Sequence, residues 1–427
     1  MDILYLAFSY PPNRAISANR AFVWTSGLAA RGHRVRVVTA EALGSLADPR
    51  HLNALASSGV EVVRTSGAGS RRLMRAREKA QASRRTSRRR VPGLSWLRQT
   101  LKLEPEAVWL PEALATCARL IRERRPDVIF ITGRPFVAFH LAPLLRLSGA
   151  AVVLDLRDPW SLSYDRGEPT TRALAAQEAW VFRHADAILL NTKASFDAYQ
   201  RVYAGQPVAE RMHLIPNVVT QAPPSEAATR RDPFVVFYGG TLYSRDLNPL
   251  IRAFQGFVRA RGLDASQARL ELVGNIHADC YDKAVLDGAG DLVRLRPPIP
   301  HADFAAELDA ASVSVMHIGR FRLCTPGKFF ESLSKGKPMF VIGPSDHPLR
   351  ATVAELGIGA SADEADEAGL RQALDALYDE VVPRMEAEPL PAEALDALSV
   401  GTWLPRLEAV LEGVALDPSG RPTHPAS

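Results

Sequence analysis

The sequence predicts an α/β protein built from two Rossmann-like, doubly wound domains that face a cleft. Short apolar runs, such as ILYLAF near the N-terminus, alternate with amphipathic helical patterns along the chain. A stretch rich in proline and alanine, 219–233, interrupts this alternation, and the same rhythm restarts after it with FVVFYG. Runs of valine, isoleucine and leucine without strict alternation are typical of parallel strands covered on both faces. Such strands separated by helices predict a doubly wound sheet in each half.

The interruption sets the predicted domain boundaries. We expect an N-terminal domain over 1–218, a linker over 219–233 and a C-terminal domain over 234–395. The amphipathic pattern within 396–415 predicts a last helix that packs back on the N-terminal domain. The polar tail 416–427 is expected to be disordered. Because ligands bind preferentially between domains and at the carboxyl ends of parallel strands, we expect the functional residues there.

The composition is that of an ordinary globular protein, with 427 residues of which 47% are hydrophobic and 23% charged. The formal charge of +5 favours anionic partners without selecting one. Cys117, Cys280 and Cys324 show neither CxxC nor zinc-site spacing, which is typical of a reducing compartment. The N-terminus lacks the features of a signal peptide, and no run approaches the roughly 20 apolar residues of a membrane span. We therefore expect a cytoplasmic protein.

One segment, about 68–100, breaks the rhythm as a basic insertion. Its most basic part, 71–90, contains a single acidic residue, Glu78. One interpretation is a solvated insertion. The other is a dock for the anionic inner face of a membrane through 71–97, with Trp96 among the residues that enter the interface. Nucleic acid is not expected as a partner, because the basic run has no aromatic side chain on which bases could stack.

The stretch CTPGKFFESLSKGKP, 324–338, predicts a short helix that begins after Pro326 and Gly327. A helix N-terminus offers free N–H groups and a partial positive charge, which favour an anion. Lys328 fits this position if a diphosphate binds there. Glu331 lies one turn further on and can accept two hydrogen bonds from a ribose diol. The alternative is a surface ion pair between Lys328 and Glu331.

Charged residues also gather where the run VVLDL ends in the first half. Asp155, Arg157 and Asp158 lie at the predicted carboxyl end of a strand, where sites of α/β proteins form. Arg134, near the end of the preceding predicted strand, is expected to point into the cleft. A structural interpretation is equally open, in which Asp158 caps the next segment and Trp160 packs in the core.

Taken in order and with their spacings, these motifs resemble the GT-B glycosyltransferases, in particular the bacterial retaining enzymes of glycosyltransferase family 4. The resemblance runs from Met1 to about Ala415. It is carried by YPPNRAISANRAFVWTSGLAARGHRVRVVT at the start, VVLDLRDPW and HLIPNVV in the middle, and FVVFYGGTL, LELVGN and TPGKFFESLSKGKP in the second half. It implies a hexosyltransferase-type enzyme of cell-envelope or polysaccharide biosynthesis. The second half would bind a nucleotide-sugar donor, and the first half a lipid-linked or other glycan acceptor.

The resemblance assigns individual donor-binding roles in the second half. Lys328 would hold the diphosphate and Glu331 the ribose hydroxyls. The GGTL loop would let the backbone approach the phosphates, since glycine permits unusual conformations, and the base would lie near Asn275 and Ile299. The predicted donor-binding residues are Gly239, Gly240, Thr241, Arg245, Asn275, Ile299, Ile318, Pro326, Gly327, Lys328 and Glu331.

In the first half, the resemblance points to the loop SYPPNRAISANR and to the end of VVLDLRDPW. Arg20 would contact the diphosphate or the acceptor, and Asp158 would orient an acceptor hydroxyl. The predicted acceptor-binding residues are Ser17, Asn19, Arg134, Asp155 and Arg157. The predicted catalytic residues are Asp158, Lys328 and Arg20.

The chain departs from the family pattern at three positions. Leu323 stands where many members have the first glutamate of a Glu-x7-Glu pair that ends here at Glu331. Thr241 and Asp246 stand where an arginine and a lysine are common, although Arg245 is adjacent to the second position. The departures put more of the diphosphate charge on Lys328. They leave the donor sugar open, with a UDP-sugar favoured over a GDP-sugar.

No Asp-x-Asp motif is present to hold a metal ion on a diphosphate. We therefore expect metal-independent transfer without a cofactor, apart from the nucleotide-sugar co-substrate. Lys328, arginines and helix N-terminal amides would stabilise the leaving group, and the resemblance implies retention of anomeric configuration. Two alternatives stay open: a sugar-nucleotide epimerase of the same fold, and a catalytically degenerate scaffold that binds a glycan or a partner.

Overall fold

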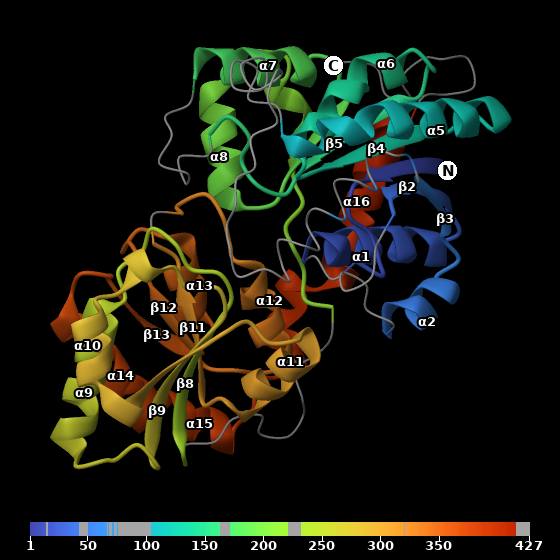
Figure 1. The fold of residues 1–427 in the computed structure, drawn as a ribbon. Coiled ribbons are helices and arrows are strands. Elements are labelled where there is room, and N and C mark those ends of the chain that lie inside the picture. The colour runs from blue at the N-terminus through green and yellow to red at the C-terminus, as the bar shows by residue number, and fades with distance from the viewer. Residues whose placement is uncertain are drawn as a thin grey trace. The chain divides into compact units, whose positions relative to one another are not determined.

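A computed structural model of the protein describes residues 1–13, 16–41, 50–65, 67, 71, 75, 104–162, 171–220, 232–319 and 321–415 (Figure 1). The chain forms two compact units. The first contains Met1–Asn217 together with the C-terminal segment from Val400, and the second is Val218–Ser399. Most of the predicted basic insertion and linker, and all of the predicted tail, lie outside the described residues.

The first unit contains a seven-stranded sheet in the order β3-β2-β1-β4-β5-β6-β7. Neighbouring strands are parallel throughout, so that Ile3 pairs with Val35 on one side and with Val128 on the other. Every residue of the three central strands is buried, which explains their unbroken apolar sequences. The strands are β1 Asp2–Ala7, β2 Arg34–Ala40, β3 Glu61–Thr65, β4 Val128–Gly133, β5 Ala151–Leu156, β6 Ala187–Leu190 and β7 Met212–Leu214.

Helices connect these strands, and their starts follow from local chemistry. Thr171 and Thr192 act as N-caps, because their side chains accept hydrogen bonds from the backbone amides of Leu174 and Ser195. The described helices of this unit are α1 Ile16–Ala30, α2 Arg50–Ala56, η2 Pro105–Trp109, α5 Leu110–Glu123, η3 Phe136–Leu141, α6 Ala142–Arg146, α7 Arg172–Phe182, α8 Lys193–Val202, η5 Ala209–Arg211 and α16 Val400–Val414.

The last helix, α16, belongs to the first unit, although the second unit precedes it in the chain. It packs on α1 at Gly27, where a Cβ atom would lie only 2.8 Å from Cδ2 of Leu404. A residue without a side chain at this position allows the two helices to approach. No helix among the described residues is long and apolar enough to cross a bilayer.

The second unit contains a six-stranded parallel sheet in the order β10-β9-β8-β11-β12-β13. The strands are β8 Phe234–Gly239, β9 Ala268–Val273, β10 Val293–Arg296, β11 Val313–His317, β12 Met339–Ile342 and β13 Gly359–Ala362. In Figure 1, α9 and α14 lie on one side of this sheet and α11 and α12 on the other. The described helices are α9 Asn248–Arg261, η6 Ala278–Cys280, α10 Lys283–Gly288, η7 Gly290–Leu292, α11 His301–Ala310, α12 Gly327–Ser334, α13 Pro348–Glu355, α14 Glu367–Ala376, η8 Leu377–Val381, α15 Val382–Ala387 and η9 Ala392–Leu398.

The predicted fold class is confirmed, because both units are Rossmann-like, with parallel strands and flanking helices. In both sheets the strand order reverses next to the first strand of the unit, β1 or β8. In α/β proteins this reversal marks where ligands bind, outside the carboxyl ends of the strands. The reversals lie between β8 and β11 in the second unit and between β1 and β4, next to β5, in the first.

Candidate functional site

Helix α12 begins where the sequence predicts, with Pro326 at its N-cap and Gly327 as its first residue. Its buried face is anchored to the sheet, because Ser332 Oγ donates a hydrogen bond of 2.9 Å to Ser314 Oγ on β11. Phe329 and Leu333 are buried in the core of the unit. This anchoring fixes the first turn of α12 beside the carboxyl ends of β8 and β11.

The side chain of Lys328 points from this first turn to the end of β8. Its Nζ atom lies 3.6 Å from the centre of the Tyr238 ring. Nζ is buried and has no hydrogen-bond partner among the described residues. Burial, and to a smaller extent the nearby charge of Arg245, holds the pKa of the Lys328 amine well below its usual range. The described residues thus leave this amine without an anionic partner at a strand end.

Arg245 supplies a permanent cation beside the Lys328 amine. Its guanidinium carbon lies 4.4 Å from the centre of the Phe321 ring, and Nη2 donates to the Ile318 carbonyl at 3.3 Å. Its Nε atom is buried and has no hydrogen-bond partner among the residues described. The preceding residue, Ser244, has a φ of 53°, a left-handed conformation that costs about 1–3 kcal/mol for most non-glycine residues. Such backbone strain often accompanies a functional position.

His317, the last residue of β11, completes this group. Its ring is buried and neither nitrogen makes a well-formed hydrogen bond in the described part of the chain, although the backbone of Asp246 lies close enough to oppose the lowering of its pKa. The nearest carboxylate oxygen, Glu364 Oε1, is 3.8 Å from Nε2. Burial first, and then the charges of Arg245 and Lys328, lower the pKa of His317 to about 3. At neutral pH the imidazole is therefore uncharged, with one nitrogen able to donate and the other able to accept. We call Arg245, His317 and Lys328 the cationic cluster.

The glycine loop after β8 lies next to the cationic cluster. Tyr238 Oη donates to the Thr241 carbonyl at 3.0 Å, which fixes the ring beneath Lys328. Gly240 has a φ of 136°, and a Cβ atom there would meet only Tyr238 Oη, at 3.9 Å. At Gly274 a Cβ atom would lie 1.9 Å from the Gly240 carbonyl oxygen, so two glycine backbones pack directly on each other. Among the described residues, no atom therefore crowds the Cβ position of Gly240.

Other predicted donor-binding residues have structural roles that their contacts explain. At Gly239 a Cβ atom would clash with Phe304 at 2.1 Å, so packing by itself explains this glycine. Ile318 is fully buried in the core; in this structure its carbonyl holds Arg245 while its side chain is inaccessible. Asn275 is exposed, and its carbonyl accepts the Leu242 amide at 3.0 Å.

Three more predicted donor-binding residues can be located in the second unit. Ile299 is half-buried and packs, as Phe304 does, against the small core cluster that contains Phe237. Thr241 is exposed, and Glu331 is half-buried one turn after Lys328. The predictions therefore separate into residues around the cationic cluster and residues used in packing. His317 was not predicted, although a histidine ending the apolar run VSVMHI is a polar signal at a strand end.

In the first unit, Arg20 and Asp155 are bonded to each other. Arg20 Nη2 donates to Asp155 Oδ1 at 2.7 Å, and both side chains are almost fully buried. Arg20 also donates to the carbonyls of Ile215 and Pro216, at 2.8 and 2.7 Å. Asp155 accepts a further hydrogen bond from Thr132 at 2.8 Å. These hydrogen bonds connect α1 to β5 and to the segment after β7. Arg20 and Asp155, for which the sequence predicts ligand binding, thus have a structural role in the first unit.

Arg157 is also used within the first unit. Its Nε donates to the Gly133 carbonyl at 2.6 Å, and Nη2 donates to the Arg134 carbonyl. Burial lowers the pKa of Arg157, while the neighbouring carboxylates Asp155 and Asp158 oppose that shift. The guanidinium that is predicted to contact an acceptor therefore already holds the loop after β4 through these hydrogen bonds.

Arg134 and Asp158 form the exposed charged pair at this strand end. Arg134 Nε lies 3.1 Å from Asp158 Oδ2, and the side chains are 36% and 39% exposed. Next to this pair, Trp160 is buried against Phe136 and His140. The structure thus shows an accessible carboxylate at 158 and a packed ring at 160. Asn19 is exposed on α1, whereas the side chain of Ser17 lies outside the described residues.

Comparisons with known proteins agree with this architecture. Residues 18–218 match the family model of the glycosyl transferase 4-like domain. No curated protein sequence matches the chain. Among solved structures, the sucrose-phosphate synthase of Thermosynechococcus elongatus has a TM-score of 0.63 at 17% identity, and the match covers 96% of this chain and 98% of that one.

Two further solved structures share the fold. WaaG, described as a glycosyltransferase involved in lipopolysaccharide biosynthesis, has a TM-score of 0.53 at 14% identity and covers 93% of this chain and 99% of its own. A structure described as trehalose-6-phosphate from E. coli bound with UDP-2-fluoro glucose has a TM-score of 0.58 at 11% identity, with 96% and 99% covered. At these identities the likeness establishes the fold, and chemical specificity has to be argued from the site.

Proposed function

We propose that this chain, a glycosyltransferase of the GT-B fold whose residues 18–218 form a glycosyl transferase 4-like domain, transfers a hexose from a nucleoside diphosphate sugar to a hydroxyl group of a glycan or lipid-linked acceptor. The observation that carries the donor assignment is Lys328 Nζ, buried and without a hydrogen-bond partner among described residues. A diphosphate would supply the anionic partner that this amine lacks.

The cationic cluster suits a diphosphate for three reasons. Arg245 and Lys328 are both cations or potential cations, and each has a buried nitrogen without a described hydrogen-bond partner. The N-terminus of α12 adds backbone amides that favour negative charge. His317 adds a neutral donor whose pKa of about 3 keeps it from titrating at neutral pH. These groups would bind the donor and stabilise the charge that develops on the leaving group.

The transfer that we propose uses neither a protein nucleophile nor a metal ion. The bond between the anomeric carbon and the diphosphate oxygen breaks, and the acceptor oxygen bonds to the anomeric carbon. The acceptor proton moves to the departing phosphate oxygen, which gives a nucleoside diphosphate and a retained glycoside. Glu331 would hold the ribose hydroxyls, and Asp158 would orient the acceptor hydroxyl. The resemblance to family 4 supports the stereochemical part of this proposal.

UDP is the favoured nucleotide, and a cell-envelope or polysaccharide glycan is the favoured acceptor. One structure of the same fold is described as bound with UDP-2-fluoro glucose, and another as a glycosyltransferase involved in lipopolysaccharide biosynthesis, which supports these choices. We place the reaction in the cytoplasm, with the basic segment 71–97 as a contact for anionic lipid at the inner membrane face.

Calorimetric titration of the protein with UDP, GDP and dTDP, followed by their sugar conjugates, tests the donor assignment. We expect UDP to bind and Lys328→Met or Arg245→Met to weaken binding by at least about tenfold, as loss of a charge-assisted hydrogen bond of roughly 1.5–3 kcal/mol implies. Lys283→Met is the matched control, because Lys283 is 83% exposed on α10 and forms a surface ion pair with Asp287. Equal affinities of wild type, Lys328→Met and Arg245→Met would overturn the assignment.

A further inference from the structure

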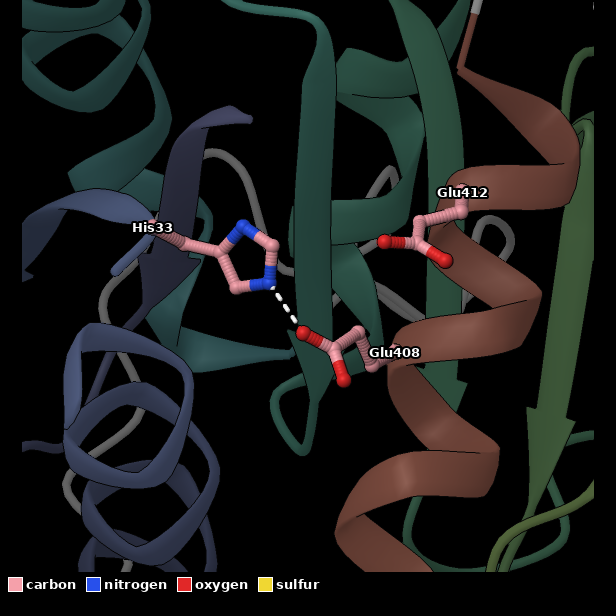
Figure 2. Close-up of side chains that lie close together, drawn as sticks. All are labelled: His33, Glu408 and Glu412. Carbon is pink, nitrogen blue, oxygen red and sulfur yellow. Dashed lines mark hydrogen bonds and ion pairs between the residues drawn. The ribbon is translucent and has the colours of Figure 1, made fainter. Parts of the chain in front are cut away.

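A second cluster of ligating side chains lies in the first unit, where α16 packs beside the turn between α1 and β2. It consists of His33 from that turn and of Glu408 and Glu412 from α16, and we call it the His33 cluster. One ligand atom of each residue lies within 4.8 Å of the others. Figure 2 shows the His33 ring facing the Glu408 carboxylate, with Glu412 one helical turn further along α16. A spacing of four residues puts both glutamates on one face of the helix.

Two of the three proposed ligands, His33 and Glu408, also contact other groups through their second polar atom. The Met1 amino group lies 3.0 Å from His33 Nδ1, and Arg31 Nε donates to Glu408 Oε2 at 2.6 Å. These contacts leave His33 Nε2 and Glu408 Oε1, 2.6 Å apart, as the pair that faces inward. Arg31 orients Glu408 through the oxygen that does not contact His33, as supporting groups of metal ligands do. The Met1 ammonium donates to Nδ1 and therefore favours the tautomer of His33 with its proton on Nε2. The side chains of His33 and Glu408 are only 9% and 13% exposed, whereas Glu412 is exposed.

We propose that the His33 cluster binds a divalent transition metal ion, with His33 Nε2 and one oxygen each of Glu408 and Glu412 as ligands. One imidazole and two carboxylates suit Zn²⁺ and its neighbours among the first-row metals. Mg²⁺ and Ca²⁺ prefer oxygen ligands alone, so the imidazole disfavours them. The remaining coordination positions would be filled by water.

Two features of the site oppose the ion and set what binding requires. The short contact between Nε2 and Oε1 holds a proton that the metal ion must displace. With the ion on Nε2 the neutral ring carries its proton on Nδ1, so the Met1 amino group must also lose a proton in order to accept the hydrogen bond from Nδ1. Tetrahedral metal–ligand bonds of about 2.0–2.2 Å place neighbouring ligand atoms roughly 3.3–3.6 Å apart, so this pair, 2.6 Å apart, must open by about 0.7–1.0 Å. The positive charge of Arg31 also lowers the affinity, which makes a reversible site more consistent with the geometry than a permanently filled one.

The ion would stabilise the fold by linking two parts of the first unit that are distant in the sequence. His33 and Glu408 are 375 residues apart in the chain, so one ion bound by both joins the C-terminal helix to the start of the first unit. A ligand that binds only the folded state raises its stability by mass action. This role is separate from sugar transfer and does not depend on the proposed function.

Metal binding can be tested directly with Co²⁺, whose visible absorption reports an inner-sphere site, and with Zn²⁺ in thermal unfolding. After treatment with chelator and its removal, we expect one Co²⁺ per chain, displaced by Zn²⁺ and not by Mg²⁺. Zn²⁺ should raise the unfolding temperature. His33→Ala and Glu412→Gln should weaken binding by about 10–100-fold or more, in line with the effect of losing a single supporting group.

Glu412→Gln is the decisive variant, because Glu412 is exposed and its replacement leaves the contacts of Glu408 with His33 and Arg31 in place. Glu386→Gln, an exposed glutamate on α15, is the matched control and should bind metal as the wild type does. The proposal is overturned if the chain takes up no stoichiometric Co²⁺, or if Glu412→Gln and Glu386→Gln bind Co²⁺ equally.

Discussion

Lys328 Nζ lies over the face of the Tyr238 ring, 3.6 Å from its centre, and no described residue offers it a hydrogen bond. A ring face attracts a cation but replaces only part of the hydration that burial removes. The amine is therefore in a less favourable position than an exposed lysine while the site is empty. An anion bound beside it would reverse that balance, and this is why Lys328 links the stability of the protein to its proposed ligand.

Replacing Lys328 with methionine should stabilise the free protein. Methionine fills a similar volume without a buried amine, and removal of such an uncompensated group is expected to add about 1–2 kcal/mol to the free energy of unfolding at neutral pH. The pKa of folded Lys328 is lowered from about 10.5, so between the two pKa values the unfolded state binds more protons and the wild type gains stability as pH rises. Thermal unfolding at several pH values should show the advantage of Lys328→Met shrinking toward pH 10. Parallel curves for the two proteins would contradict the assignment of a depressed pKa.

Nucleotide binding should be coupled to proton uptake by Lys328. A diphosphate beside the amine favours its charged form, so binding raises the lowered pKa and the complex takes up a proton. Calorimetric titrations with UDP at pH 8, where the terminal phosphate with a pKa of about 6 is already ionised, isolate this effect. The observed enthalpy should vary with the ionisation enthalpy of the buffer for the wild type and for Lys283→Met. A buffer-independent enthalpy in the wild type would argue against a neutral amine in the free site.

The strands were predicted from the sequence more completely than the arrangement of the side chains around them. Long apolar runs predicted the central strands of both sheets, because buried parallel strands need Val, Ile and Leu on both faces. Strand β13 was missed, since its sequence GASA contains only small residues and is half-buried. The start of α12 was predicted from a proline and a glycine, which act locally and can be recognised without tertiary structure.

The composition of the candidate site was harder to predict, because it depends on residues far apart in the chain. Lys328 and Glu331 could be identified within one helix. The approach of Arg245 depends on a left-handed Ser244 and on Gly319, whose missing side chain leaves room for the Arg245 Cγ atom. Neither conformation is evident in the sequence. Likewise, Arg20 and Asp155 were both recognised as candidates, but nothing in a sequence separation of 135 residues showed that they bond to each other.

The Arg20–Asp155 pair should act as a structural element of the first unit. Both side chains are almost fully buried, and removing one partner of such a pair leaves an uncompensated charge that costs about 3–5 kcal/mol. Arg20→Met and Asp155→Leu should each lower the unfolding free energy by that amount in denaturant titrations. The double variant should lose less than the sum, because it leaves no unpaired charge. Strictly additive losses would show that the two residues are not coupled, and full stability of Arg20→Met would return Arg20 to a role in ligand binding.

Asp158→Asn should separate activity from stability. The Arg134–Asp158 pair is more than one-third exposed on both sides, and exposed ion pairs contribute about 0–1 kcal/mol, so the unfolding free energy should change little. If Asp158 orients the acceptor hydroxyl, the turnover number with an established donor and acceptor should fall by about 100-fold or more, as for other groups that position a reacting hydroxyl. UDP affinity, which we assign to the second unit, should stay the same. Asp197→Asn is the matched control, because Asp197 is 38% exposed on α8 and paired with Lys193 in the same unit. Equal turnover of the two variants would assign Asp158 to the loop structure, as the alternative interpretation of RDPW holds.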